Sequence, residues 1–275
     1  MRLAVALALT RPRITCMVGA AALFGALLHG GGDPFSVAIA CVGSMLVCAG
    51  CSALNQLQER ARDARMARTA SRPLPSGRMT AAEVRPIAAA LFAGGAVLYF
   101  LAGGWPLVAV GALIVAVYNG LYTPLKPRTQ LALLVGGTVG ALPPLTGWVA
   151  AGGGVLDAPI VLATGVLFLW QVPHFWLLAE KHREDYARAG FPVPAAVLPE
   201  RLYRLLTALW VGAFFLGLAC LAARGGAGAS AAGFGALGAG AVVSLSALGG
   251  NVRLVQAALN GSLALAFLGQ VLRVF

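Results

Sequence analysis

The sequence predicts an all-α membrane protein that crosses the bilayer nine times. Of its 275 residues, 59% are hydrophobic and only 11% are charged, which is too apolar for an ordinary soluble domain. The chain also contains nine apolar segments of roughly the 20 residues that a transmembrane helix needs. They cover residues 14–31, 35–56, 84–103, 105–124, 130–151, 159–180, 204–223, 227–249 and 254–274. Because they leave little other chain, we expect residues 1–275 to form a single transmembrane domain.

The basic residues give this topology an orientation. If the N-terminus lies inside, all of the 20 Lys and Arg residues except Arg224 and Arg273 fall on the inner side. The positive-inside rule predicts this distribution. We therefore attribute the net charge of +11 to membrane topology rather than to nucleic-acid binding. Since the N-terminus shows no signal-peptide cleavage pattern, we expect a bacterial inner-membrane protein with a cytoplasmic N-terminus.

The connections between the expected spans differ in character. Those on the outside are short and rich in Gly and Pro, at 30–34, 103–106 and 152–154, and are typical of turns. Two inside loops, about 57–83 and 181–203, hold all but two of the nine acidic residues in or beside them. Any polar chemistry should therefore lie at the inner, cytoplasmic face.

Three polar residues mark the inner end of the second span. Asn55, Glu59 and Asp63 are spaced four apart, after an uncharged stretch from Phe35 to Leu54. In a continuous helix each step of four turns by about 40° and rises about 6 Å, so the three would share one face. Their oxygens suit Mg²⁺, which binds through carboxylates and substrate phosphates. The alternative is a helix end whose charges are only solvated.

Basic residues follow this cluster at once, among them Arg68 and Arg72. Guanidinium groups bind oxyanions through paired hydrogen bonds, so carboxylates followed by arginines indicate a diphosphate site. Further along, Tyr122 and Lys126 lie four apart at an inner helix end. A lysine there could neutralise a phosphate or could only snorkel to the membrane surface.

Two later segments interrupt apolar spans with polar or helix-breaking residues. Pro143 and Pro144 predict a broken helix that lines a cavity. His174 follows Pro173 inside a span and could accept a proton, bind a metal or haem, or bridge two helices. Glu184 and Asp185 just beyond could hold a second metal or pair with nearby arginines.

Taken together, these segments resemble the UbiA superfamily of intramembrane prenyltransferases, and most specifically its haem O synthase branch. Residues 55–77 resemble the first aspartate-rich motif and the RTxxRPLPxG continuation of that branch. Residues 122–126, Tyr-Thr-Pro-Leu-Lys, resemble its YxxxK motif and are followed by GALPPLTGW at 140–148. Residues 173–176 and 185–190 resemble its PHFW and DYxRAG signatures.

The resemblance implies nine helices around a central cavity that opens to lipid. It also implies transfer of a farnesyl group from farnesyl diphosphate to a vinyl group of haem b, with Mg²⁺ as cofactor and haem O as product. It suggests a haem A synthase as a partner. The implied catalytic residues are Asn55, Glu59, Asp63, Lys126 and Asp185, of which the first three would hold Mg²⁺ through the diphosphate. The implied substrate-binding residues are Arg68, Thr69, Arg72, Tyr122, Arg128, His174, Trp176, His182, Glu184, Tyr186 and Arg188.

The sequence departs from the family pattern at two places. Glu59 stands where the first motif usually has Asp. Where other superfamily members carry a second pair of aspartates, this chain has His182 and Tyr186, with Glu184 and Asp185 between them. The haem O synthase branch generally lacks that second pair. Two other functions remain: prenyl transfer to a quinone precursor or another aromatic acceptor, and non-catalytic haem handling or transport.

Overall fold

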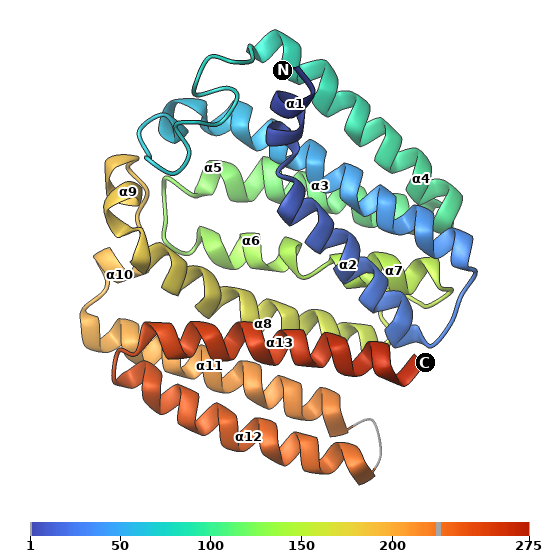
Figure 1. The fold of residues 1–275 in the computed structure, drawn as a ribbon, viewed down its shortest axis with the longest axis vertical. Helices are drawn as coiled ribbons and strands as arrows, with labels where there is room; N and C mark the ends of the chain where they lie inside the picture. Colours follow the sequence, from blue (N-terminus) through green and yellow to red (C-terminus); the bar gives the residue numbers. More distant parts are fainter. Residues whose placement is uncertain (1, 224–226, 275) are drawn as a thin grey trace. The chain divides into compact units, whose positions relative to one another are not determined.

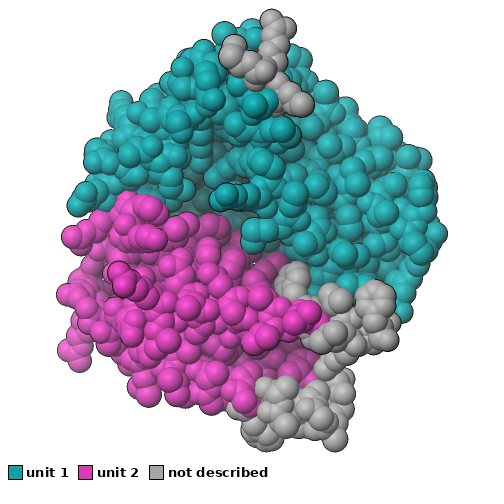
Figure 2. All heavy atoms as spheres, viewed as in Figure 1, with its two compact units in different colours: residues 1–155, 184–192 teal, residues 156–183, 193–275 magenta. Residues whose placement is uncertain are grey.

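The computed structural model describes residues 2–223 and 227–274, and all regular structure within these ranges is helical (Figure 1). The chain divides into two compact units, coloured separately in Figure 2. Unit 1 comprises residues 1–155 and 184–192, and unit 2 comprises residues 156–183 and 193–275. The single domain expected from the sequence stays a prediction.

Unit 1 contains most of the helices, including one in the π form. They are α1 (Arg2–Thr10), α2 (Pro12–His29), α3 (Pro34–Asp63), α4 (Ala81–Val115), the π-helix η1 (Ala116–Tyr122), α5 (Thr123–Leu125), α6 (Ala132–Gly140), α7 (Pro143–Ala150) and nearly all of α9 (Arg183–Arg188). Unit 2 contains α8 (Ala158–Lys181), α10 (Pro194–Val197), α11 (Glu200–Ala223), α12 (Ala227–Leu248) and α13 (Val252–Val274).

Membrane-spanning character is evident in the described helices. Six helical segments are long and apolar enough to cross a bilayer, and two shorter apolar stretches, Gly235–Leu248 and Val252–Ala266, follow within the described residues. Large apolar side chains on the helices, such as Leu101, Leu209 and Leu245, are exposed, as lipid-facing residues should be. The all-α membrane fold is thus confirmed, while the number of nine spans stays a prediction.

One of the six segments, Ala81–Leu125, contains two of the expected spans. Within α4, Gly103 and Gly104 have non-helical backbone angles, and Gly104 has a φ of 65°, which favours glycine. A Cβ added at Gly111 would lie 2.7 Å from the ring of Tyr99. In an unbroken helix these two residues would be about 18 Å apart along the axis. The chain therefore turns back at Gly103–Gly104, where the sequence separates spans 84–103 and 105–124.

The expected break near the paired prolines is also present. Helix α6 ends at Gly140, and α7 begins at Pro143 with prolines in its first turn. Proline suits that position because it has no N–H to leave unbonded. Pro173, in contrast, lies inside α8, which continues across it to Lys181.

The inner loops begin and end at different places from those expected. Helix α3, which contains the second expected span, continues to Asp63, so the first inner loop starts at residue 64 rather than at about 57. The second, expected over 181–203, contains α9, α10 and the start of α11. Hydropathy alone could not place these boundaries, because the polar residues at the end of α3 are buried against other parts of unit 1.

Helices α2 and α7 approach each other closely through two glycines. A Cβ at Gly25 would lie 1.7 Å from the carbonyl oxygen of Pro144, and a Cβ at Gly147 would lie 1.7 Å from that of Ala22. Such backbone contact is typical of small residues between membrane helices. It fixes α7, and with it the broken span, against the N-terminal helices.

We expect Gly147→Ala to lower the free energy of unfolding by about 1–3 kcal/mol or more, because the added methyl group meets backbone that cannot rotate away. The matched control is Gly165→Ala, where a Cβ meets no atom within 4 Å. Alanine also favours a helix over glycine by about 1 kcal/mol, so the control should unfold no earlier than the original protein. Thermal unfolding in detergent compares the two. An unchanged midpoint for Gly147→Ala would contradict the close contact.

Candidate active site

The polar residues at the inner end of α3 lie in the interior of unit 1. Asn55, Glu59 and Asp63 are 2%, 4% and 3% exposed. Because α3 is helical through Asp63, the three share one face, as the spacing predicted. Two carboxylates buried this deeply require compensating charge. The interpretation as a merely solvated helix end is therefore wrong.

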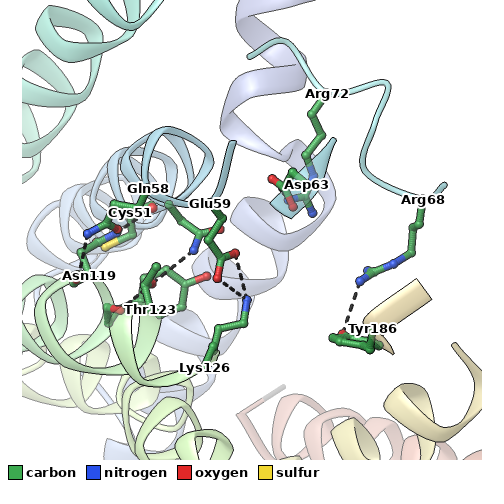
Figure 3. A network of polar contacts seen from close by, with 12 residues as sticks. Cys51, Gln58, Glu59, Asp63, Arg68, Arg72, Asn119, Thr123, Lys126 and Tyr186 are labelled. Atoms are coloured by element: carbon green, nitrogen blue, oxygen red, sulfur yellow. Dashed lines mark hydrogen bonds and ion pairs between the residues drawn. The ribbon is translucent and has the colours of Figure 1, made fainter. Parts of the chain in front are cut away.

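Glu59 is paired with Lys126, which lies just after α5 (Figure 3). The Lys126 Nζ atom is 2.8 Å from Glu59 Oε1 and 2.9 Å from Oε2, and it donates a hydrogen bond to Oε2. The carboxylate side chain is 5% exposed and the lysine side chain 22%. Buried Oε1 thus has a cation nearby but no hydrogen bond within the described structure.

Asp63 is paired with Arg72 in the loop that follows α3 (Figure 3). Arg72 Nη1 donates to Asp63 Oδ2 over 2.7 Å, and the Thr69 hydroxyl donates to the Asp63 carbonyl oxygen over 2.8 Å. Burial lowers the pKa of the Arg72 guanidinium, and the positive charge of Arg11 lowers it further, while Asp63 acts in the opposite direction. The loop after α3 therefore folds back to neutralise the helix end.

Arg11 was not among the residues singled out from the sequence. It lies between α1 and α2 with φ 53° and ψ 63°, the left-handed conformation that is uncommon for a residue with a side chain. The hydrogen bond from Gln56 Nε2 to the Leu9 carbonyl oxygen, 2.8 Å, attaches α1 to α3 nearby. Arg11 stands directly before a proline, as residues at many helix starts do. The sequence therefore contained no distinctive signal for a role of Arg11.

A second polar network joins α3 to the π-helix η1. Gln58 Nε2 donates to the Asn119 carbonyl oxygen over 2.8 Å, and Asn119 Nδ2 donates to Gln58 Oε1 and to the Cys51 carbonyl oxygen over 3.2 Å each. Asn55 Nδ2 donates to the Thr123 hydroxyl over 3.2 Å. Extra-wide π turns occur often at functional sites. Here the network holds the segment that carries Tyr122 and Lys126 against Asn55 and Glu59.

The DYARAG segment also belongs to this cluster. Its Asp185 accepts a hydrogen bond from the Ala67 N–H over 3.3 Å and forms an ion pair with Arg188. Burial acts to raise the pKa of the Asp185 carboxyl, but the Ala67 and Arg68 N–H groups together with Arg188 outweigh it and hold the pKa below its usual value. Asp185 therefore anchors the loop after α3 as an ionised carboxylate.

Aromatic rings from two segments surround the cations. Arg68 Nη2 donates to the Tyr186 hydroxyl over 3.3 Å (Figure 3). Lys126 Nζ lies 5.4 Å from the centre of the Tyr122 ring and 5.0 Å from that of Phe191. These distances are within the range of cation–π attraction. Phe191 was not singled out from the sequence, because only the folded chain brings it beside Lys126.

The remaining site residues are either exposed or belong to unit 2. Arg128, Glu184 and Arg188 are exposed, although Arg188 also pairs with Asp185. Unit 2 carries the other three, which are His174 and Trp176 within α8 and His182 at its C-terminal end. His174 stacks on Trp170 with ring centres 4.4 Å apart, and buried Trp176 stacks on Tyr203 at 6.0 Å. The functional roles of all these residues stay predictions.

The donor set on α3 fits Mg²⁺. Carboxylate and amide oxygens are its preferred protein ligands, and it usually takes one or two carboxylates together with phosphates and water. Oε1 of Glu59 accepts no hydrogen bond in the described structure but forms an ion pair with Lys126 Nζ over 2.8 Å, so an ion would bind this oxygen by displacing the lysine. No group of three or more His, Cys, Asp and Glu residues suited to a metal occurs in the described part of the chain.

Comparison with known proteins places the chain among prenyltransferases. The model of the UbiA prenyltransferase family matches residues 16–268. A protoheme IX farnesyltransferase from Oleidesulfovibrio alaskensis is 42% identical over 213 residues, covering 78% of this chain and 75% of its own. One from Geobacter sulfurreducens is 41% identical over 220 residues, covering 80% of this chain and 81% of its own.

A solved structure supports the same fold. A UbiA homologue from Archaeoglobus fulgidus bound to DMAPP and Mg²⁺ superposes with a TM-score of 0.67 at 15% sequence identity. The match covers 94% of this chain and 99% of that one. Family match, relatives and fold agree, so this chain is a multi-pass membrane protein that belongs to the UbiA prenyltransferase family.

Proposed function

We propose that this protein transfers a farnesyl group from farnesyl diphosphate to a vinyl group of haem b and so forms haem O. The observation that carries the proposal is the buried row Asn55, Glu59 and Asp63, whose two carboxylates are each paired with a cation. Its relatives named protoheme IX farnesyltransferase, at about 40% identity over most of the chain, support the choice of acceptor.

The paired charges suit a site for a magnesium diphosphate. Without substrate, Lys126 and Arg72 neutralise Glu59 and Asp63. When bound, Mg²⁺ would be held by Asn55, Glu59 and Asp63 and would supply positive charge next to the diphosphate. The two cations could then turn from the carboxylates to the phosphate oxygens, so that substrate exchanges one set of ion pairs for another. Arg68, on the same loop, adds donors, and Thr69 supports the substrate site through the hydrogen bond from its hydroxyl to the Asp63 carbonyl oxygen.

The cations favour departure of the diphosphate. As the bond between farnesyl carbon 1 and the diphosphate oxygen breaks, charge grows on the leaving group, where Lys126, Arg72 and Arg68 stabilise it. The allylic cation that remains must be kept from water, as a membrane interior does. Tyr122 and Phe191, which already lie over Lys126, would shield this region with aromatic surface.

The acceptor completes a balanced reaction. The terminal vinyl carbon of haem b forms a bond to farnesyl carbon 1, and the resulting cation lies on the carbon next to the porphyrin. Water adds there and loses a proton, giving the hydroxyethylfarnesyl group. The products are haem O, diphosphate and one proton. We assign His174 to contact with the haem, as an iron ligand or as a local base.

The location follows from the charge map. We place the protein in a bacterial inner membrane with a cytoplasmic N-terminus and the diphosphate site at the cytoplasmic face. Farnesyl diphosphate and haem b would be its substrates in the lipid bilayer. A haem A synthase is the partner that would use the product.

The experiment is an assay with purified protein, farnesyl diphosphate, haem b and Mg²⁺, followed by mass spectrometry of the haem. The expected product has the mass of haem b plus a farnesyl group and a hydroxyl group. Chelation of the metal with EDTA should stop product formation, and added Mg²⁺ should restore it. Unchanged haem b under all conditions, in protein that remains folded, would overturn the proposal.

A further inference from the structure

Unit 2 contains a polar pair that joins two helices far apart in sequence. Nδ1 of His174, on α8, lies 3.1 Å from Oδ1 of Asn260, on α13. Helices α8 and α13 are in contact and run beside each other in Figure 1. The imidazole also stacks on Trp170 with an interplanar angle of 25°. The ring is therefore held by a hydrogen bond at its edge and by an indole on its face.

The identity of the Asn260 atom decides where the imidazole proton lies. An amide oxygen accepts a hydrogen bond, so this contact is a hydrogen bond in the tautomer whose proton lies on His174 Nδ1. In the neutral ring, Nε2 then has a free lone pair. Asn260 is a neutral partner, so it favours a second proton on the ring less than a carboxylate would. The pair thus selects the form of histidine that binds a metal through Nε2.

The position of the pair indicates that it meets a ligand. Polar side chains within membrane helices are expensive and usually functional. Asn260 is exposed and His174 is half-buried, so the core of unit 2 does not enclose them. The neighbouring α13 residues Leu254 and Leu265 are exposed and apolar, as lipid-facing residues should be. The pair therefore lies outside the packed core of unit 2, where a ligand can reach it.

We propose that Asn260 is a positioning residue for His174, whose Nε2 lone pair it directs to the iron of the haem acceptor. This inference rests on the proposed function, because that function supplies haem b as the ligand. Partners that hold the second nitrogen of a metal-binding histidine fix its tautomer and raise its basicity. In this arrangement His174 is an iron ligand rather than a local base.

The test uses the full-length protein in detergent, titrated with ferric haem b and followed by Soret absorption and low-temperature EPR. Asn260→Leu keeps a similar volume but removes the acceptor. Asn260→Asp keeps an oxygen that can accept the Nδ1 proton. Gln256→Ala is the matched control, since it removes an amide from α13 one turn before Asn260. His174→Ala is combined with Asn260→Leu to complete a double-mutant cycle.

We expect Asn260→Leu to weaken haem affinity by about 10- to 100-fold, the usual loss when such a supporting hydrogen bond is removed. In the His174→Ala background the same change should have no further effect. Asn260→Asp should keep affinity within a few-fold and alter the EPR g values, because a carboxylate makes the imidazole a stronger donor. Gln256→Ala should match the original protein in both measurements.

Three results would overturn the inference. The first is an Asn260→Leu variant that binds haem as the original protein does. The second is that Asn260→Leu lowers haem affinity by the same factor in the His174→Ala background as in the original protein. The third is a His174→Ala variant with unchanged haem affinity and spectrum. These outcomes differ from failure of the proposed function. If the original protein makes haem O while Asn260→Leu binds haem normally, only the role of Asn260 is refuted. If it makes no haem O, the proposed function fails.

Discussion

Asp63→Asn is expected to reduce turnover by about 10²- to 10³-fold or more while the protein stays folded. The substitution removes the charge that Arg72 neutralises and that a magnesium diphosphate would use. It keeps the shape of the side chain and leaves the backbone carbonyl that accepts from Thr69. Arg72 loses its partner, but its side chain is 17% exposed, so the guanidinium keeps contact with polar surroundings and the protein should stay folded. Initial rates of haem O formation, together with thermal unfolding, measure the two effects separately.

The control for this change lies at the other end of the same helix. Asp33 caps α3, and its Oδ2 accepts from the Ser36 N–H over 2.8 Å. Asparagine is as good an N-cap as aspartate, so Asp33→Asn should leave turnover and stability nearly unchanged. If Asp63→Asn retained more than half of the original rate, the assigned role of Asp63 would be refuted.

Lys126→Met is expected to affect both stability and activity. It leaves the Glu59 carboxylate, whose side chain is 5% exposed, without its cation. Breaking a buried ion pair in this way costs about 3–5 kcal/mol, and the 22% exposure of Lys126 places the expectation at the lower end. Activity should fall as well, because the leaving diphosphate loses a cation. Chemical or thermal unfolding in detergent and the farnesyl-transfer rate give the two readouts.

A double variant separates the two effects of this change. Glu59→Gln combined with Lys126→Met removes both charges and should recover most of the lost stability, yet it should remain inactive. Lys181→Met removes the other lysine of the chain, which is exposed at the end of α8, and should be neutral in both respects. If the double variant were less stable than Lys126→Met alone, the ion pair would not be what stabilises this region.

The sequence could predict those parts of the site that follow from local geometry. The four-residue spacing of Asn55, Glu59 and Asp63 determines their common face in any helix, and the structure confirms that face. The breaks at Gly103–Gly104 and at Pro143 follow from residues with special backbone preferences. In each case the physical cause lies within a few positions of the chain.

The remainder depends on which helices pack together, and spacing carries no such information. Gln58 looks like a solvated residue at a helix end, yet it bonds to Asn119, 61 positions away. Phe191 lies over Lys126 because the DYARAG segment folds onto the loop after α3. In the sequence, Asn260 is one polar residue in an apolar span. Only the packing of α13 against α8 brings it to His174. Glu59 departs from the family motif, yet its carboxylate forms an ion pair with Lys126.

The most direct test of the account is a competition between acceptors. Purified protein receives farnesyl diphosphate and Mg²⁺ with equal concentrations of haem b and 4-hydroxybenzoate, an aromatic quinone precursor, and both products are quantified by mass spectrometry. Haem O should be the dominant product, and it should be lost in the Asp63→Asn variant. Farnesylated hydroxybenzoate without haem O would contradict it, since the chain would then be a prenyltransferase for an aromatic acceptor.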